Sequence, residues 1–581
     1  MKTAGDSIPR RQRKVESPMS KIVALAENQL REAVLAALGA AVAAEELPAE
    51  PIPAFTVEVP GDRAHGDLSA NTAMVSAKAF RLPPRKIAES ILRHLSLEGT
   101  YFEKAETAGP GFLNFFLSPA FYADVVADVL EQGESYGRSD YGQGKRVMVE
   151  FVSANPTGPM HMGNARGGAL GDCLAAVLDA AGYSVWREFY VNDAGNQIEK
   201  FGVSLEARYI QHLRGEDAVE FPEDAYHGDD IREHAANFAA LYGDKYLDAP
   251  AEERRAALVA YALPLNIERM HRDLEKYRIV YDEWFMESSL HKSGAVQAVV
   301  DLLAQKGLTY EKDGAVWYKA SENGGEKDEV LIRANGNPTY FAADIAYHRN
   351  KFERGFDTCI DVWGADHHGH VARMKGAMDA IGLDGNKLQV VLIQLVRLMQ
   401  GGEVVRMSKR SGKAIQLSDL LDEVPVDAAR FFFNLREANT RMDFDLDLAV
   451  EQSSSNPVYY VQYAHARICS IFKNLAADGI LPRACTQAEL MRLSTPEEKE
   501  LIRHLAACTG EIVAAAEAYE PARITRYCME LATLFHKFYN ACRVKGEEEP
   551  LLQARLALCA AARTTLKNVL TLLKIEAPEA M

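Results

Sequence analysis

The spacing of apolar residues along the chain predicts a multidomain protein with an α/β centre. Residues 19–45 have a helical period, and a strand-like run at 55–59 follows a proline-rich break. Further along, apolar alternation predicts a strand over 146–152, a helix over 164–181 and a second strand over 184–191. Elements of these types in this order indicate a βαβ unit, the building block of a parallel sheet.

Beyond this unit the pattern is helical and charged over about 195–305, which predicts an insertion between two halves of a doubly wound sheet. Apolar runs at 356–363 and 388–396 suit buried parallel strands, so the sheet is expected to resume there. From Leu417 onward nearly everything has a helical period. The expected fold class is α/β multidomain: a Rossmann-like parallel sheet with a helical insertion, a small α+β N-terminal domain and an all-α C-terminal bundle.

These changes of pattern also place the expected boundaries. A chain of 581 residues is too long for one core, so a division into several domains is expected. We expect a flexible extension over 1–18, a small mixed domain over 19–118, a Rossmann-like domain over 119–416, a connecting helical segment over 417–455 and a helical domain over 456–581.

Charge is spread unevenly over these domains. The net charge of −17 by itself disfavours a polyanionic partner. Residues 456–581, however, hold 15 Lys and Arg against 14 Asp and Glu, so the acidic excess lies in the first 455 residues. This distribution permits a nucleic-acid surface near the C-terminus and agrees equally well with an ordinary solvated helical surface.

Cysteine usage and the lengths of apolar runs bear on the compartment. The eight cysteines include no Cys-x-x-Cys pair and no regular spacing, so we expect reduced thiols and a cytoplasmic protein. The most apolar run, Ala33 to Ala44, has 12 residues, short of the ~20 that a spanning helix needs. Residues 1–18 are basic without a following apolar stretch, so we expect neither a secretory signal nor a membrane segment.

A turn rich in proline and glycine, residues 154–164, joins the first predicted strand to its helix. Nucleotides bind at this position in doubly wound sheets, because the helix N-terminus offers amides and positive potential to phosphates. Gly163 has no side chain and would let an adenine approach the backbone, while His161 and Asn164 can donate hydrogen bonds to phosphate oxygens. Considered alone, a histidine in such a turn is more often structural than catalytic.

A second candidate is the basic, glycine-flanked segment from Gly401 to Lys413, which follows a predicted strand. Lys409 offers a compact positive charge to oxygens whose negative charge grows as pyrophosphate leaves. The segment could close over a triphosphate, but by itself an exposed basic turn is the simpler interpretation.

Together the two segments resemble the paired signatures of class I aminoacyl-tRNA synthetases, His-x-Gly-His and Lys-Met-Ser-Lys-Ser. Asn164 replaces the last histidine of the first, and the second differs in Arg406 and in the arginine after Lys409. Each difference keeps a hydrogen-bond donor. The resemblance implies catalytic roles for His161, Asn164, Ser408 and Lys409, and an ATP site made of His161, Gly163, Asn164, Asp366, His367, Met407, Ser408 and Lys409.

Further segments are similar to the arginyl-tRNA synthetases in particular: Glu150-Phe-Val-Ser-Ala-Asn155, residues 190–197, Tyr340-Phe-Ala-Ala-Asp344 and Trp363-Gly-Ala-Asp-His-His368. The resemblance covers nearly the whole chain. It implies an arginine–tRNA ligase that forms arginyl-adenylate from ATP and L-arginine, often only with tRNA present, and then loads tRNA(Arg). It also implies Mg²⁺ carried with ATP, tRNA binding by 19–118, catalysis by 119–416 and anticodon binding by 456–581. We expect a monomer.

Arginine as substrate agrees with the chemistry of these residues. A guanidinium has five donors in a rigid fork, so its pocket should offer carboxylates and an aromatic face. By the resemblance, Asp344 and Tyr340 recognise the guanidinium with help from Glu150, while Ser153 and Asn155 hold the α-amino end. Without the resemblance, Tyr340 and Asp344 would be interpreted as a buried aromatic residue and a surface acid on one helix face.

Three other functions remain as alternatives. A different class I synthetase shares the two signatures but not the acidic pocket residues. A tRNA-binding protein without chemistry would not need intact His161, Gly163, Ser408 and Lys409. A metal hydrolase could be built on the cluster from Asp366 to His370, but adjacent side chains point different ways and no further ligand motif accompanies them, so we expect no metal site.

Overall fold

The computed structural model describes residues 20–405 and 415–581, so the expected extension over 1–18 lies outside the described residues. The chain forms two compact units. The first contains residues up to 139 together with 471–513 and 533–565. The second contains 140–470, 514–532 and 566–581.

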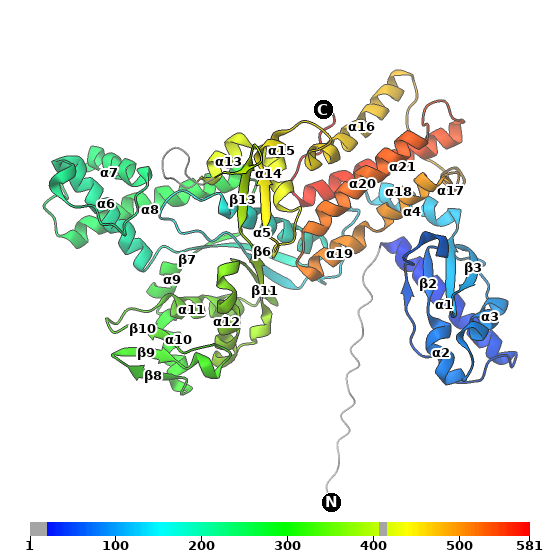
Figure 1. Cartoon of the computed structure of the whole chain (residues 1–581), viewed down its shortest axis with the longest axis horizontal. Helices are drawn as coiled ribbons and strands as arrows, with labels where there is room; N and C mark the ends of the chain where they lie inside the picture. The colour runs from blue at the N-terminus through cyan, green and yellow to red at the C-terminus, as the bar shows by residue number, and fades with distance from the viewer. Residues whose placement is uncertain (1–19, 406–414) are drawn as a thin grey trace, which may run out of the picture. The chain divides into compact units, whose positions relative to one another are not determined.

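The second unit is built on a five-stranded parallel sheet (Figure 1). Its order is β12 (Leu388–Ile393), β11 (Thr358–Gly364), β5 (Arg146–Glu150), β6 (Ser184–Val191) and β7 (Glu283–Met286). The chain first adds β6 and β7 on one side of β5 and later adds β11 and β12 on the other, with all neighbours parallel. The predicted parallel, doubly wound sheet is therefore confirmed, and its strand order reverses between β5 and β11, where such sheets bind ligands.

Helices cover both faces of this sheet. On one face lies α5 (Gly163–Ala180), the helix predicted to follow the first strand. The other face carries α9 (Glu287–Lys292), α10 (Ala295–Gln305), α11 (Tyr340–Glu353) and α12 (His368–Ile381), whose apolar side chains form a buried cluster with Met148 of β5. Since side chains alternate along a strand, Met148 and Glu150 of β5 project toward the α11 face.

The helical insertion is smaller than the predicted 195–305. Helices α6 (Asn196–Arg214), α7 (Asp229–Tyr242) and α8 (Ala251–Lys276) pack on one another around a core of their own. Strand β7 then joins the central sheet beside β6, which corrects the prediction of an uninterrupted insertion. Its four residues are too few to show a strand period within a long charged helical region.

A three-stranded antiparallel sheet was not predicted. It consists of β8 (Thr309–Lys312), β9 (Ala315–Tyr318) and β10 (Glu329–Ile332). The turn between β8 and β9 is Asp313-Gly314, both with positive φ, 55° and 75°. An Asp-Gly pair between short apolar runs is the usual signal of a two-residue hairpin, so this element could have been found in the sequence.

The region after β12 differs from the prediction in two ways. The run at 388–396 contains all of β12 and the first residue of β13 (Val396–Gln400). Strand β13 belongs to another sheet, with β14 (Glu403–Val404) and β15 (Met442–Asp445). The segment 417–455 has helices α13 (Leu417–Glu423), α14 (Val426–Phe433) and α15 (Leu446–Val450), but β15 lies among them and pairs in parallel with β13. The expected purely helical connection is thus wrong at this strand, which is too short to break the helical period.

The first unit begins with the α+β arrangement that was predicted. Helices α1 (Lys21–Ala43), α2 (Thr72–Phe80) and α3 (Pro84–His94) accompany an antiparallel sheet. Its strand order is β1 (Val57–Glu58), β2 (Leu68–Ala70), β4 (Phe112–Leu117) and β3 (Phe102–Ala108). Helix α4 (Pro119–Gln132) follows and contacts α17 (Gln487–Leu490) and α18 (Pro496–Ala506) within the same unit.

The described C-terminal part is helical, as predicted. It comprises α16 (Pro457–Ala477), α17 and α18, then α19 (Cys508–Ala518), α20 (Ala522–Ala541) and α21 (Glu549–Leu572). Its last residues belong to the second unit, where the buried Arg430 donates from Nε to the carbonyl of Leu573 at 2.8 Å. No helix of the part of the chain described is long and apolar enough to cross a membrane.

Candidate active site

A cavity of about 1030 Å³ opens at the carboxyl ends of β5, β6 and β11. This is the position where the strand order reverses. Its lining includes seven residues that the sequence had singled out in three separate segments: Glu150, Ser153, Asn155, Tyr340, Asp344, Asp366 and His367. The fold therefore brings the predicted amino-acid site and part of the predicted nucleotide site into one cavity.

The turn after β5 shapes one wall of the cavity. Val152 and Ser153 both have positive φ, 71° and 41°, a conformation that is unfavourable for side chains and especially for a β-branched one. The turn directs the Ser153 side chain to Glu150. The Ser153 hydroxyl donates a hydrogen bond to Glu150 Oε1 at 2.8 Å and accepts one from the backbone N–H of Tyr190 at 3.1 Å. Backbone strain of this kind is found where a site requires a fixed geometry.

Helix α11 provides the opposite wall. Thr339 caps it by accepting from the amide of Ala342, so Tyr340 is the first helical residue and Asp344 follows one turn later. Asp344 Oδ2 lies 3.2 Å from His370 Nε2. The other nitrogen of that ring, Nδ1, faces the guanidinium of Arg373 at 2.6 Å and must accept, so the neutral ring donates from Nε2 to Asp344. The Asp344 carboxylate thus accepts from His370 and also lines the cavity.

A further acid, Glu287, lies close to this wall and was not predicted. It begins α9, directly after β7, and burial raises the pKa of its carboxyl. The Asn192 amide donates to its Oε2 at 3.0 Å, and His291 Nε2 lies 3.2 Å from Oε1. Both Asn192 and Tyr190 line the cavity. The signal that could have found Glu287 is an acid at the carboxyl end of a sheet strand, but β7 itself was not predicted.

The first predicted nucleotide signature pairs with residues that come shortly after the second one in the chain. Residues 160–162 pair with 415–417: Met162 donates its amide to Ile415 and Leu417 donates to Met160, both at 2.9 Å. Met407, Ser408 and Lys409 of the second signature lie outside the described residues. The grouping of the two signatures in one nucleotide site therefore stays a prediction.

His161 has a defined hydrogen-bonding state. Its Nδ1 accepts the amide N–H of Gly163 at 3.0 Å. Burial lowers the pKa of the ring, which favours the neutral form. The single proton then sits on Nε2, which is left to donate to a ligand. Asn164 lies in the first turn of α5, where the backbone amides point out of the helix N-terminus.

The cluster from Asp366 to His370 does not converge. Asp366 and His367 belong to a short helical turn and have side chains 81% and 58% exposed, whereas His370 is directed to Asp344. Across residues 20–405 and 415–581, no group of three or more His, Cys, Asp and Glu side chains could hold a metal ion. The arrangement gives no support to the metal-hydrolase alternative.

Three family models match the chain in succession. Residues 28–117 match the arginyl tRNA synthetase N terminal domain, 125–470 match the tRNA synthetases class I (R) catalytic domain, and 461–581 match the DALR anticodon binding domain. The catalytic model alone spans more than half of the chain.

Similar proteins agree over the full length. The chain is 56% identical to an arginine–tRNA ligase of Ruminiclostridium cellulolyticum and 55% identical to one of Acetivibrio thermocellus. Both alignments cover 97% of this chain and 100% of the relative. Among solved structures, the arginyl-tRNA synthetase of Thermus thermophilus shares the fold, with a TM-score of 0.69 and 24% identity over 95% of this chain and 100% of that one.

Proposed function

Because the chain belongs to the arginyl-tRNA synthetase family and ligates arginine to tRNA(Arg) with ATP, we propose that arginine binds in the cavity between the β5 turn and α11. The observation that carries this proposal is the convergence of Tyr340 and Asp344 with Glu150, Ser153 and Asn155 on one cavity. Asp344 receives the guanidinium fork and Tyr340 lies beside it, while Ser153 and Asn155 hold the α-amino end. Glu287 adds a second carboxylate nearby.

The chemistry proceeds by displacement at phosphorus. The arginine carboxylate attacks the α-phosphorus of ATP, pyrophosphate leaves, and arginyl-adenylate remains bound. In our proposal the 2′-hydroxyl of the terminal tRNA nucleotide then attacks the adenylate carbonyl and AMP leaves. No protein nucleophile takes part, so positioning and charge stabilisation provide the catalysis.

We assign the nucleotide to the α5 side of the cavity. His161, Gly163 and Asn164 receive the phosphates at the α5 N-terminus, and Asp366 with His367 contacts the ribose or adenylate. Met407, Ser408 and Lys409 complete the ATP site in this proposal. Mg²⁺ arrives with ATP, and substrate oxygens are most of its ligands.

The tautomer of His161 leads to a graded prediction. Nε2 is the atom that faces the phosphates, and glutamine places an amide nitrogen near that position, whereas asparagine places one near Nδ1. His161→Gln should therefore retain more activity than His161→Asn. His161→Ala should slow adenylate formation by about tenfold or more, since a hydrogen bond to a charged group contributes ~1.5–3 kcal/mol. Single-turnover rates with saturating arginine measure this order, and an asparagine variant faster than the glutamine variant would contradict the assignment.

We propose that 456–581 binds the anticodon and that 19–118 also contacts tRNA, in a monomer. Support for the first assignment comes from the family model matched at 461–581. Tyr463, 37% exposed, lies in α16 with the Arg467 guanidinium 4.7 Å from its ring and the Tyr459 ring parallel to it. Unpaired bases stack on such surfaces. We also propose a cytoplasmic location, because the eight cysteines include no Cys-x-x-Cys pair and no regular spacing of the kind found in disulfide frameworks.

Tyr463→Ala should weaken tRNA binding by about tenfold, because stacking of one base contributes ~1–3 kcal/mol. The KM for full-length tRNA(Arg) in aminoacylation measures the effect, with Tyr463→Phe as the variant that keeps the ring. A minihelix that carries only the acceptor stem is the matched control, since it lacks an anticodon and should be charged equally by all three proteins. Equal KM values for full-length tRNA would remove Tyr463 from the anticodon surface.

The substrate itself is tested by pyrophosphate exchange with each standard amino acid, with and without tRNA. We expect exchange with arginine and with no other standard amino acid. Exchange with another amino acid would favour a different class I synthetase, and tRNA binding without any exchange would favour a protein that has lost its chemistry.

A further inference from the structure

Beneath the cavity floor lies a row of three buried carboxylates on adjacent parallel strands. Asp361 of β11 is in register with Glu150 of β5, which is in register with Glu188 of β6. Their exposed fractions are 0%, 8% and 0%. Since residues in register on neighbouring parallel strands project to the same face, the three acids form one row, and buried anions require partners.

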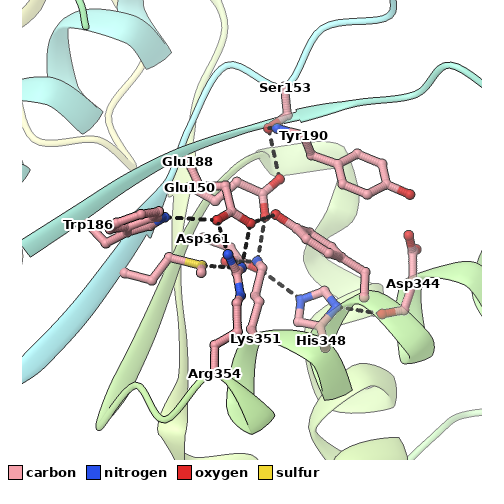
Figure 2. A network of polar contacts seen from close by, with 12 residues as sticks. Glu150, Ser153, Trp186, Glu188, Tyr190, Asp344, His348, Lys351, Arg354 and Asp361 are labelled. Carbon is pink, nitrogen blue, oxygen red and sulfur yellow. Dashed lines mark hydrogen bonds and ion pairs between the residues drawn. The ribbon is translucent and has the colours of Figure 1, made fainter. Parts of the chain in front are cut away.

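Helix α11 and its C-cap residue Arg354 supply a base for each acid, in the same order (Figure 2). His348 Nε2 lies 2.8 Å from Asp361 Oδ2. Lys351 Nζ pairs with Asp361 Oδ1 at 2.7 Å and also with Glu150 Oε2. Arg354 binds both oxygens of Glu188 at 2.7 Å.

The hydrogen bonds define the charges of the inner group. His348 Nδ1 faces the backbone carbonyl of Asp344 at 2.8 Å, and Nε2 faces a carboxylate. Both oxygens accept, so a ring with both protons satisfies both contacts. The neighbouring cations bring the pKa of Asp361 to about 2 against the effect of burial. Glu150, Lys351, Asp361 and His348 then contain two negative and two positive charges.

Lys351 is the member of this group that acts on the cavity through another residue. It is fully buried and does not line the cavity, but its partner Glu150 does. The remaining oxygen of Glu150 holds Ser153. Burial raises the pKa of Glu150 and Lys351 opposes this effect, so the carboxylate depends on Lys351 for its negative charge.

We propose that Lys351 is a positioning residue for arginine recognition: it holds the Glu150 carboxylate ionised and oriented so that Glu150 and Ser153 present a fixed set of acceptors to the substrate. The inference rests on the proposed placement of arginine in this cavity. The Arg354–Glu188 pair, at the C-terminal end of the same helix and on the same sheet face, is an ion pair with a fully buried acid that does not line the cavity, although the Arg354 side chain is 26% exposed.

That pair provides the matched control. Lys351→Met and Arg354→Met each remove one base that faces the row of acids and should both lower the melting temperature. Only Lys351→Met should raise the KM for arginine, by about tenfold, with the KM for ATP changed less than about twofold. Lys351→Arg keeps the charge and should restore most of the arginine affinity. The assay is arginine-dependent pyrophosphate exchange with tRNA present, together with calorimetric arginine binding.

Two outcomes would overturn the inference: an unchanged KM for arginine in folded Lys351→Met, or an equal rise in both methionine variants. If Lys351→Met does not fold, Lys351→Gln replaces it. Glutamine can still donate a hydrogen bond to Glu150 but carries no positive charge, so the KM for arginine should rise about threefold while that for ATP stays constant. No change would again overturn the inference. Normal arginine affinity in folded Asp344→Ala would instead refute the placement of arginine in the cavity.

Discussion

Replacing Asp344 with alanine is expected to reduce arginine affinity by roughly 2–5 kcal/mol, a loss of about thirtyfold or more, while ATP binding persists. In the proposed complex the guanidinium displaces water from its contact with Asp344. In Asp344→Ala the guanidinium would have lost the Asp344 carboxylate as its partner, and an unpaired buried charge is costly.

The same carboxylate should exclude lysine and citrulline. Lysine has the charge of arginine but not the planar fork, and citrulline has a similar shape without the charge. Asp344→Asn keeps the volume and an acceptor for His370 but loses the negative charge. Its arginine affinity should lie between those of wild type and Asp344→Ala if charge dominates.

Arginine-dependent exchange, arginine affinity and melting temperature, measured on these three proteins, separate recognition from stability. If Asp344 only anchors His370, the melting temperature falls and specificity stays the same. Normal arginine affinity in folded Asp344→Ala would refute the proposed role.

Lys409→Ala should slow adenylate formation by about a hundredfold and leave arginine binding nearly unchanged. The lysine charge matters most as pyrophosphate departs, and loss of one such stabilising contact costs ~3 kcal/mol in the transition state. Lys413→Ala, in the same basic segment but outside the signature, is the control and should retain most of its activity. Rapid-quench measurement of single-turnover activation tests both variants, and a Lys409→Ala rate equal to wild type would show that this lysine does not act on the leaving group.

The sequence predicted the parts of the fold whose local pattern is long or unambiguous. The strand predicted at 184–191 is found with those bounds, and the helix predicted at 164–181 differs from α5 by one residue at each end. Both are long enough to show a clear period. Strands β7 and β15 were missed, because four residues within helical surroundings carry little periodic signal.

The site was predicted unevenly for a related reason. Residues within recognisable segments, such as Ser153 and Asp344, lie on the cavity as expected. Glu287 and Lys351 stand alone in the sequence, and only the strand order brings them to the site. The sequence around Lys351 does not distinguish a buried lysine from one on the surface of a helix. Only the strand order, which aligns Asp361 and Glu150 opposite Lys351, shows that it is part of a buried ion pair.

The row of ion pairs also specifies how α11 is seated on the sheet during folding. His348, Lys351 and Arg354 are spaced three residues apart, a rise of about 4.5 Å each, close to the ~4.8 Å between strands. A slip of α11 by one such step would leave a base or an acid at the end of the row without a partner, at a cost of roughly 3–5 kcal/mol. A purely apolar contact would tolerate that slip more readily, so the charges select one alignment among several of similar packing.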